Sequence, residues 1–349
     1  MLSLTLVLFL AAGVFADNRT ILGSFELLWS SKHQYPSVKV LHRLSRKVLF
    51  QTIDGEPSVR GGWALEYGQT IVDGNHVGRD LLLLKTTAQN IVDVKVDNQS
   101  LVFEGFIWGI TEKAHYSLHF GLIEDAPNQL ALGLEVVPIR GAFNRVFLNY
   151  WAHEEESFHG FGVQYSNWNL KGHRVPIVVA EQGVGRGVQP LTAILNQFAK
   201  GSGGDYLKSY APKAVYITNQ NRAVLFENSE TMFFDLRRPG KVGVELWGFS
   251  LRGRILAGDS MLDLVSEITH VTGRMKQLPE WTQVGAVVGL EGGSETVNAK
   301  IDILRKKGLP LSAIWLQVSY PVTLTYHYTP TIIDESKPIL GLVGPSTCS

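Results

Sequence analysis

The chain contains 349 residues, of which 45% are hydrophobic and 18% are charged, a composition typical of a folded protein rather than a disordered one. Thirty-two Lys and Arg residues match thirty-two Asp and Glu residues, so no net positive field favours general binding of nucleic acid or anionic lipid. The single cysteine, Cys348, excludes a disulfide framework and a zinc site built from several thiolates.

The first 16 residues have the pattern of a secretory signal peptide. An apolar run over residues 2–14 ends at Val14-Phe15-Ala16, which fits a cleavage site. A buried strand is the alternative interpretation of this run, but a polar segment follows it. No stretch reaches the roughly 20 apolar residues that a membrane helix needs. We therefore expect a secreted or lumenal protein, with the endolysosome among the compartments that fit, and no membrane span.

Two Asn-x-Ser/Thr sequons fit a secretory location. They begin at Asn18 and Asn98, and both asparagines are candidate glycosylation sites. Such short patterns also recur by chance, so they support secretion only weakly.

Short apolar runs with a period of two, separated by turn residues, extend over residues 18–256. Residues 92–96 alternate strictly, residues 97–99 can turn, and residues 101–103 resume the strand, which predicts a hairpin. The same pattern recurs at residues 116–122, 130–136, 214–218, 223–226 and 242–246. Many short strands with this spacing predict a large antiparallel β-sandwich.

Two helices interrupt the strand pattern. The first has Pro190 in its first turn and Gly201 as its C-terminal stop. The second is capped by Asp259 or Ser260 and ends at Gly273. The first carries Leu191, Leu195 and Phe198, and the second has on one side Met261, Leu262, Val265 and Ile268.

The pattern changes after residues 278–281, Leu-Pro-Glu-Trp, which we interpret as a domain boundary. The apolar run at 284–290 is typical of a parallel strand covered on both faces. A helix capped by Ser294 should follow, with Val297, Ile301 and Leu304 facing inward and Gly308 as its stop. Residues 313–317 form another short strand, so this segment predicts one βαβ unit. An eight-fold barrel needs about 250 residues, and only a few dozen remain after residue 281.

Two motifs have spacings that argue against their functional interpretations. Residues 181–187, Glu-Gln-Gly-Val-Gly-Arg-Gly, lack the flanking strand and helix of a phosphate loop. A tight turn that presents Gln182 and Arg186 is the favoured interpretation. His153 and His159 lie six positions apart, whereas a zinc-binding helix of the H-E-x-x-H type needs four. The sequence therefore predicts no metal site and no cofactor.

Several motifs, in order, resemble family 31 glycoside hydrolases of the sulfoquinovosidase-like branch. The resemblance begins with residues 158–166, Phe-His-Gly-Phe-Gly-Val-Gln-Tyr-Ser, and continues through residues 170–172 and 181–186. It then includes residues 203–206, 278–281, 289–293 and 313–317. It covers about residues 150–317, whereas residues 18–150 match the family only in strand character.

The resemblance implies an N-terminal β-sandwich of the galactose-mutarotase-like type and a catalytic (β/α)8 barrel that hydrolyses α-glycosidic bonds with retention. One aspartate in such enzymes attacks the anomeric carbon and another protonates the leaving oxygen, about 5 Å away. Family members continue with an Asp-Trp pair after the position of Gln317, where the match ends. Neither aspartate therefore has a counterpart, no catalytic residue is assigned, and we expect the chain to be inactive alone.

Two positions carry over to the sugar pocket by resemblance. Glu291 and Gln317 follow the first two barrel strands, at the end where barrels build their sites. Sulfoquinovose-specific members usually have Gln or Lys at the position of Glu291, and a carboxylate there would repel a sulfonate. A neutral α-glucoside or α-galactoside is therefore an open alternative. Gln182 and Arg186 belong to a sandwich loop that the resemblance associates with the barrel mouth.

The expected fold is mainly β, with a large antiparallel sandwich before the first βαβ unit of a truncated (β/α)8 barrel. The expected segments are a signal peptide at 1–16, the sandwich at 17–277, the barrel start at 278–317, and a non-homologous, disordered tail at 318–349. One hypothesis is a secreted α-glycosidase, for an α-linked glycoside, in shortened form. Another is a non-catalytic secreted carbohydrate-binding sandwich, and a third is an unrelated sandwich that merely resembles the family.

Overall fold

The computed structural model describes residues 17–72, 75–180, 182–198, 202–316 and 331–332. The chain divides into two compact units, one ending at Gly273 and the other beginning at Arg274. The expected signal peptide lies outside the described residues. So does the expected tail, apart from strand β22 (Thr331–Ile332), which pairs antiparallel with β21 (Leu311–Leu316).

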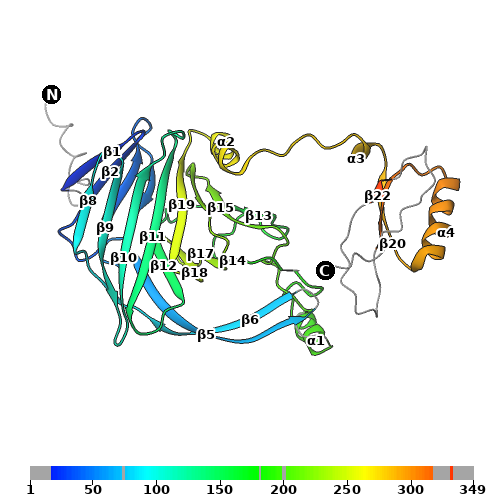
Figure 1. Ribbon diagram of the computed structural model, residues 1–349, viewed down its shortest axis with the longest axis horizontal. Helices are drawn as coiled ribbons and strands as arrows, with labels where there is room; N and C mark the ends of the chain where they lie inside the picture. Colours follow the sequence, from blue (N-terminus) through cyan, green and yellow to red (C-terminus); the bar gives the residue numbers. More distant parts are fainter. Residues whose placement is uncertain (1–16, 73–74, 181, 199–201, 317–330, 333–349) are drawn as a thin grey trace, which may run out of the picture. The chain divides into compact units, whose positions relative to one another are not determined.

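Three antiparallel sheets form the first unit (Figure 1). The four-stranded sheet has the order β1-β2-β3-β4, with β1 (Asn18–Leu22), β2 (Phe25–Ser30), β3 (Ser37–His42) and β4 (Val48–Gln51). The six-stranded sheet has the order β14-β17-β18-β12-β5-β6, with β14 (Arg174–Ile177), β17 (Met232–Asp235), β18 (Lys241–Leu246), β12 (Arg145–Trp151), β5 (Val59–Val72) and β6 (Asn75–Lys85).

The nine-stranded sheet has the order β13-β15-β16-β19-β11-β10-β9-β7, and β8 also pairs with β9. Its strands are β13 (Phe158–Gly162), β15 (Pro212–Thr218), β16 (Arg222–Phe226), β19 (Ser250–Ala257), β11 (Gln129–Arg140), β10 (Lys113–Leu122), β9 (Ser100–Trp108), β7 (Ala88–Gln89) and β8 (Asp93–Val96). The predicted hairpins are confirmed, because β8 pairs with β9 and β10 pairs with β11. The mainly β antiparallel fold is therefore confirmed as well.

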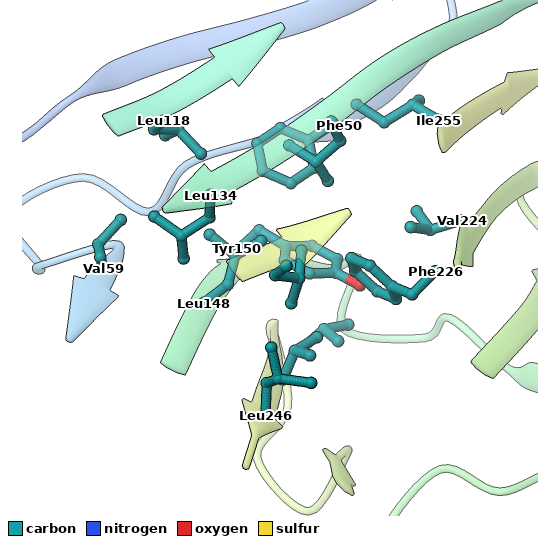
Figure 2. Close-up of a cluster of buried hydrophobic side chains, with 14 of the residues drawn as sticks. Phe50, Val59, Leu118, Leu134, Leu148, Tyr150, Val224, Phe226, Leu246 and Ile255 are labelled. Atoms are coloured by element: carbon teal, nitrogen blue, oxygen red, sulfur yellow. The ribbon is translucent and has the colours of Figure 1, made fainter. Parts of the chain in front are cut away.

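One hydrophobic core joins the three sheets (Figure 2). Side chains at alternate strand positions point into it, because successive residues of a strand face opposite sides. Leu134 comes from the nine-stranded sheet, Leu148 from the six-stranded sheet and Phe50 from the four-stranded sheet. The Phe50 ring centroid lies 5.0 Å from that of Tyr150 and 5.6 Å from that of Phe120. The period-two pattern in the sequence thus corresponds to the buried faces of the sandwich.

The two predicted helices are present, but most of the apolar residues that the sequence singled out on them are exposed. Helix α1 (Leu191–Phe198) buries Thr192, whereas Leu191 and Phe198 are exposed. Helix α2 (Met261–Thr272) is capped by Ser260 in a capping box with Asp263. Apolar residues surround much of α2, so its contact with β15, β16 and β19 decides which of them become buried.

Helix α2 docks on the nine-stranded sheet through residues spaced one turn apart. Leu264 is fully buried, and Ile268 and Val271 pack with it against a cluster on the sheet. Met261, Leu262 and Val265, which the sequence placed on one side together with Ile268, are exposed. The expected inward face of α2 is therefore wrong for these three residues.

The second unit contains the predicted βαβ arrangement. It consists of α3 (Trp281–Val284), β20 (Ala286–Leu290), α4 (Gly293–Lys306) and the strand β21, which pairs parallel with β20. Val284 ends α3, so the strand begins later than its apolar run. Helix α4 has Gly292 as its N-cap instead of Ser294, because Gly292 adopts the left-handed conformation that starts the turn. Val297 and Ile301 face inward as predicted.

Candidate functional site

Glu291 lies at the carboxyl edge of the small parallel sheet. It directly follows β20, and Leu290 is paired with Leu316, so the two strands end side by side. Gly292 and Gly293, with φ of 107° and 80°, turn the chain into α4 immediately afterwards. A Cβ on Gly292 would approach Thr296 Cγ2 to 2.9 Å, so glycine suits this turn. Gln317 follows β21 in the sequence but lies outside the described residues.

The Glu291 side chain is exposed at this edge. Its main-chain carbonyl accepts a hydrogen bond from Lys300 Nζ at 3.2 Å, which links the strand end to the third turn of α4. An exposed carboxylate with its backbone held in this way can accept hydrogen bonds from ligand hydroxyl groups. At the predicted pocket residue, the structure thus provides a hydrogen-bond acceptor.

The two faces of the small sheet differ. On one face, Val288, Leu290 and Ile314 pack with the buried side of α4. On the opposite face, Val287 is 50% exposed and Trp315 is 56% exposed. The sequence predicted a strand covered on both faces, and within the described residues this face of β20 remains open at Val287.

The glycine-rich loop at residues 182–187 holds Gln182 and Arg186 differently. Gln182 is buried, and its Nε2 donates a hydrogen bond to the Tyr206 carbonyl at 3.1 Å. The Gln182 carbonyl accepts a hydrogen bond from Asp205 N at 2.8 Å, so the segment at 203–206 lies against the loop. Arg186, with φ of 46°, is exposed. The turn therefore presents Arg186 to solvent, whereas the Gln182 amide ties the loop together.

These candidate residues are distributed over both units. Gln182 and Arg186 come from the first unit, four positions apart in one loop, and Glu291 comes from the second. Within the described residues, the structure brings together the two loop residues and, at the sheet edge, Glu291 with the end of β21.

The histidine and glutamate motif at residues 153–159 has a structural role. Glu156 is fully buried, and its carboxylate pairs with Arg222 Nε at 2.8 Å and accepts from His153 N at 2.9 Å. His159 bonds through its ring to Ser157 Oγ and the Trp168 carbonyl. Among the residues that the structure describes, no group of three or more His, Cys, Asp and Glu side chains could hold a metal ion.

Both sequon asparagines are exposed. Asn18 opens strand β1 opposite Trp29. Asn98 lies in the turn between β8 and β9, where Asp97 Oδ1 accepts hydrogen bonds from the backbone N–H groups of Gln99 and Ser100 at 2.8 and 2.6 Å. Both side chains are therefore accessible to solvent.

The sequence patterns did not single out a groove on the first unit. This groove has a volume of about 840 Å³ and lies over the six-stranded sheet, lined by residues such as Lys85, Asn149 and Glu245. The alternation of Lys241, Gly243 and Glu245 with apolar residues was a visible signal. This alternation shows which residues face away from the core, but it does not show that six strands place such residues around one hollow.

The chain is similar in sequence to two bacterial enzymes. Sulfoquinovosidase from Escherichia coli K12 is 31% identical over 174 residues, which cover 50% of this chain and 26% of that protein. Sulfoquinovosidase from Agrobacterium fabrum C58 is 30% identical over 225 residues, which cover 59% of this chain and 34% of that protein. The chain thus spans about a quarter to a third of the length of these relatives. No family model matches it.

A solved structure shares the fold. A GH31 family sulfoquinovosidase from E. rectale, in complex with the aza-sugar inhibitor IFGSQ, matches with a TM-score of 0.65 and 21% identity, over 86% of this chain and 41% of that chain. None of the described helices is long and apolar enough to cross a membrane. The matches confirm that the chain resembles sulfoquinovosidase-like members of glycoside hydrolase family 31 over part of their length.

Proposed function

We propose that the chain is the N-terminal portion of a secreted retaining α-glycosidase. The observation that carries this proposal is the identity of about 30% to two sulfoquinovosidases, in a chain whose parallel βαβ unit presents Glu291 at the carboxyl edge. Retaining glycosidases need two carboxylates about 5 Å apart, and the family motifs assign neither to this chain.

The open face of the small sheet supports a barrel start. Val287 and Trp315 are half exposed on the side away from α4. Apolar faces of parallel strands are normally covered by neighbouring elements. Further strands and helices of a (β/α)8 barrel would cover this face.

The charge of Glu291 favours a neutral sugar over a sulfonated one. Like charges about 4 Å apart repel by about 4 kcal/mol at an effective dielectric constant of about 20. A carboxylate beside the sugar would therefore disfavour a sulfonate and accept hydrogen bonds from hydroxyl groups. We assign a neutral α-glucoside or α-galactoside as substrate, with Gln317 as second pocket residue.

A chimera tests this function. Residues 17–316 would replace the matching segment of the Escherichia coli sulfoquinovosidase, and nitrophenyl α-glucoside, α-galactoside and α-sulfoquinovoside would be assayed. We expect hydrolysis of a neutral substrate in preference to the sulfonated one. Glu291→Gln should shift the ratio of kcat/KM toward the sulfonated substrate by roughly tenfold or more, about 1.4 kcal/mol. Glu295→Gln, an exposed carboxylate four residues away on α4, is the matched control.

Each outcome bears on one part of the proposal. A folded chimera that hydrolyses none of the three substrates would contradict the glycosidase assignment. Preference for the sulfonated substrate with Glu291 intact would contradict the neutral-sugar assignment. Turnover by the unfused chain would show that it carries its own catalytic carboxylates.

Secretion has a separate test. Expressed in a eukaryotic cell, the chain should appear in the medium and carry N-linked glycan at Asn98, because this side chain is exposed in a turn. Treatment with an N-glycosidase should increase the gel mobility of the secreted chain. Asn98→Gln and Asn18→Gln should each remove one glycan, and retention of an unmodified chain in the cytosol would contradict the location.

A further inference from the structure

We propose that the groove over the six-stranded sheet, here called the sheet groove, binds an acidic saccharide, meaning a sugar that carries one carboxylate or sulfate group. All residues that line it belong to the first unit. Glu291 belongs to the second unit, so it is not among the residues that build this site. This inference goes beyond the proposed hydrolysis and stands or falls independently of it.

The sheet groove is built from strand positions that face away from the core. On β12, Leu148 enters the core while Phe147 and Asn149 line the groove. On β17, Phe234 enters the core and Asp235 lines the groove. The same alternation on β5, β14 and β18 adds further charged residues, because successive strand residues face opposite sides. The groove therefore combines charged and polar side chains with apolar ones such as Leu82, Phe147 and Phe233.

Positive charge exceeds negative charge in the sheet groove. Among the described residues that line it, six are cationic and three are acidic. Asp235 is held by Arg237 through contacts of 2.8 and 2.7 Å, and Glu245 by Arg174 at 2.8 Å. The third acid, Asp80, lies 3.7 Å from Arg145.

Three cations in the sheet groove make no ion pair with a described residue: Arg60, Lys85 and Arg238. Lys85 Nζ lies 3.6 Å above the Phe147 ring centroid, and Arg60 donates to the Thr86 carbonyl at 3.4 Å. Register places Lys85 opposite Gly62, two residues along β5 from Arg60. An anion between these two cations would gain charge-assisted hydrogen bonds from both strands.

The surroundings of Lys85 disfavour its charge in the absence of an anion. Desolvation by the groove walls, and then the charge of Arg60, lower the pKa of Lys85 to about 8. Lys241 acts in the same direction, whereas Glu245 and Asp235 oppose it. A bound anion would stabilise the ammonium group and raise its pKa again. The ammonium group of Lys85 makes no ion pair with a described residue, so its attraction to a bound anion would contribute to the binding free energy.

The other groups favour a sugar over a polyanion. The three carboxylates would repel a chain of phosphates, but they can accept hydrogen bonds from sugar hydroxyl groups. The Asn149 side chain, which lines the same wall, adds an amide. A volume of about 840 Å³ falls within the usual range for pockets that hold small ligands. One cationic end and several acceptors match a molecule with one acidic group and many hydroxyls.

Calorimetry on the full chain tests the ligand class. Glucuronic acid and glucose 6-sulfate would be titrated separately, with glucose and sodium sulfate as controls. We expect at least one acidic sugar to bind roughly tenfold or more tightly than either control, and the better one identifies the acidic group. Equal binding of sodium sulfate would overturn the saccharide assignment, and failure of both acidic sugars to bind would overturn the site.

Variants locate the binding. Lys85→Gln and Arg60→Gln should each weaken binding by roughly 10- to 100-fold, because each removes a charge-assisted hydrogen bond to the anion. Lys113→Gln is the matched control, because Lys113 Nζ also lies over a phenylalanine ring, 4.3 Å from the Phe106 centroid, but on the nine-stranded sheet. Unchanged affinity in both groove variants, or equal loss in the control, would overturn the assignment. Circular dichroism of each variant checks folding.

The pH profile supplies a second readout. Affinity should fall as pH rises through about 8, because Lys85 loses its proton there. The charged groups that act on Lys85 are Arg60, Lys241, Glu245 and Asp235. Lys85→Gln should remove the pH dependence while Lys113→Gln retains it. A wild-type profile flat between pH 7 and 9 would contradict the role of Lys85.

Discussion

Glu156 and Arg222 form an ion pair that is almost completely removed from water. Their side chains are 0% and 3% exposed, and Arg222 also donates to the Trp151 carbonyl at 3.2 Å. Removal of one partner from such a pair leaves a buried charge without compensation. The pair joins the segment before β13 to the first residue of β16.

Loss of the buried carboxylate should strongly destabilise the first unit. We expect Glu156→Ala to lower the free energy of unfolding by about 3–5 kcal/mol, measured by urea denaturation. Lys32→Ala, which breaks the exposed pair with Asp17, should cost less than about 1 kcal/mol. The double variant Glu156→Leu/Arg222→Met should recover part of the loss, and no recovery would contradict this explanation.

At the scale of the element, helix α2 shows how docking selects among apolar residues. Leu264 is fully buried against the nine-stranded sheet, whereas Leu262 on the same helix is 78% exposed. Both are leucines with equal helix propensity, so their different environments arise from the tertiary contact alone.

These two leucines form a matched pair for mutagenesis. Leu264→Ala should lower the free energy of unfolding by about 2–5 kcal/mol, because it leaves a cavity under the helix. Leu262→Ala should change it by less than about 0.5 kcal/mol. Urea denaturation followed by far-ultraviolet circular dichroism measures both, and similar effects of the two substitutions would contradict the docking seen here.

At the scale of the whole molecule, the exposed face of the small sheet should promote association between chains. Trp315 is 56% exposed and Val287 is 50% exposed, and apolar strand faces tend to pair or aggregate. We expect a concentration-dependent increase in sedimentation coefficient that Trp315→Thr reduces. Trp168→Thr removes an exposed tryptophan, 83% accessible, from the first unit and should leave association unchanged. Equal effects of the two substitutions would locate association elsewhere.

The sequence by itself determined the local structure and much of the fold. Period-two alternation identified the hairpins of β8 with β9 and β10 with β11, because one strand face must be apolar to form the core. The change of pattern after residue 281 identified the βαβ unit and put Glu291 at its carboxyl edge. The positions of glycine and proline residues predicted where the helices begin and end, because the backbone preferences of these two residues act locally.

Only the tertiary structure decided which apolar residues became buried and which side chains from distant segments came together. Apolar residues surround α2, so docking rather than periodicity selected Leu264. The Gln182 amide turned toward Tyr206 because the segment at residues 203–206 packs against its loop. The sheet groove joins Lys85 of β6 to Arg60, Asn149 and Glu245 from three other strands. Such a site depends on strand order and register between distant segments, which local sequence periodicity does not encode.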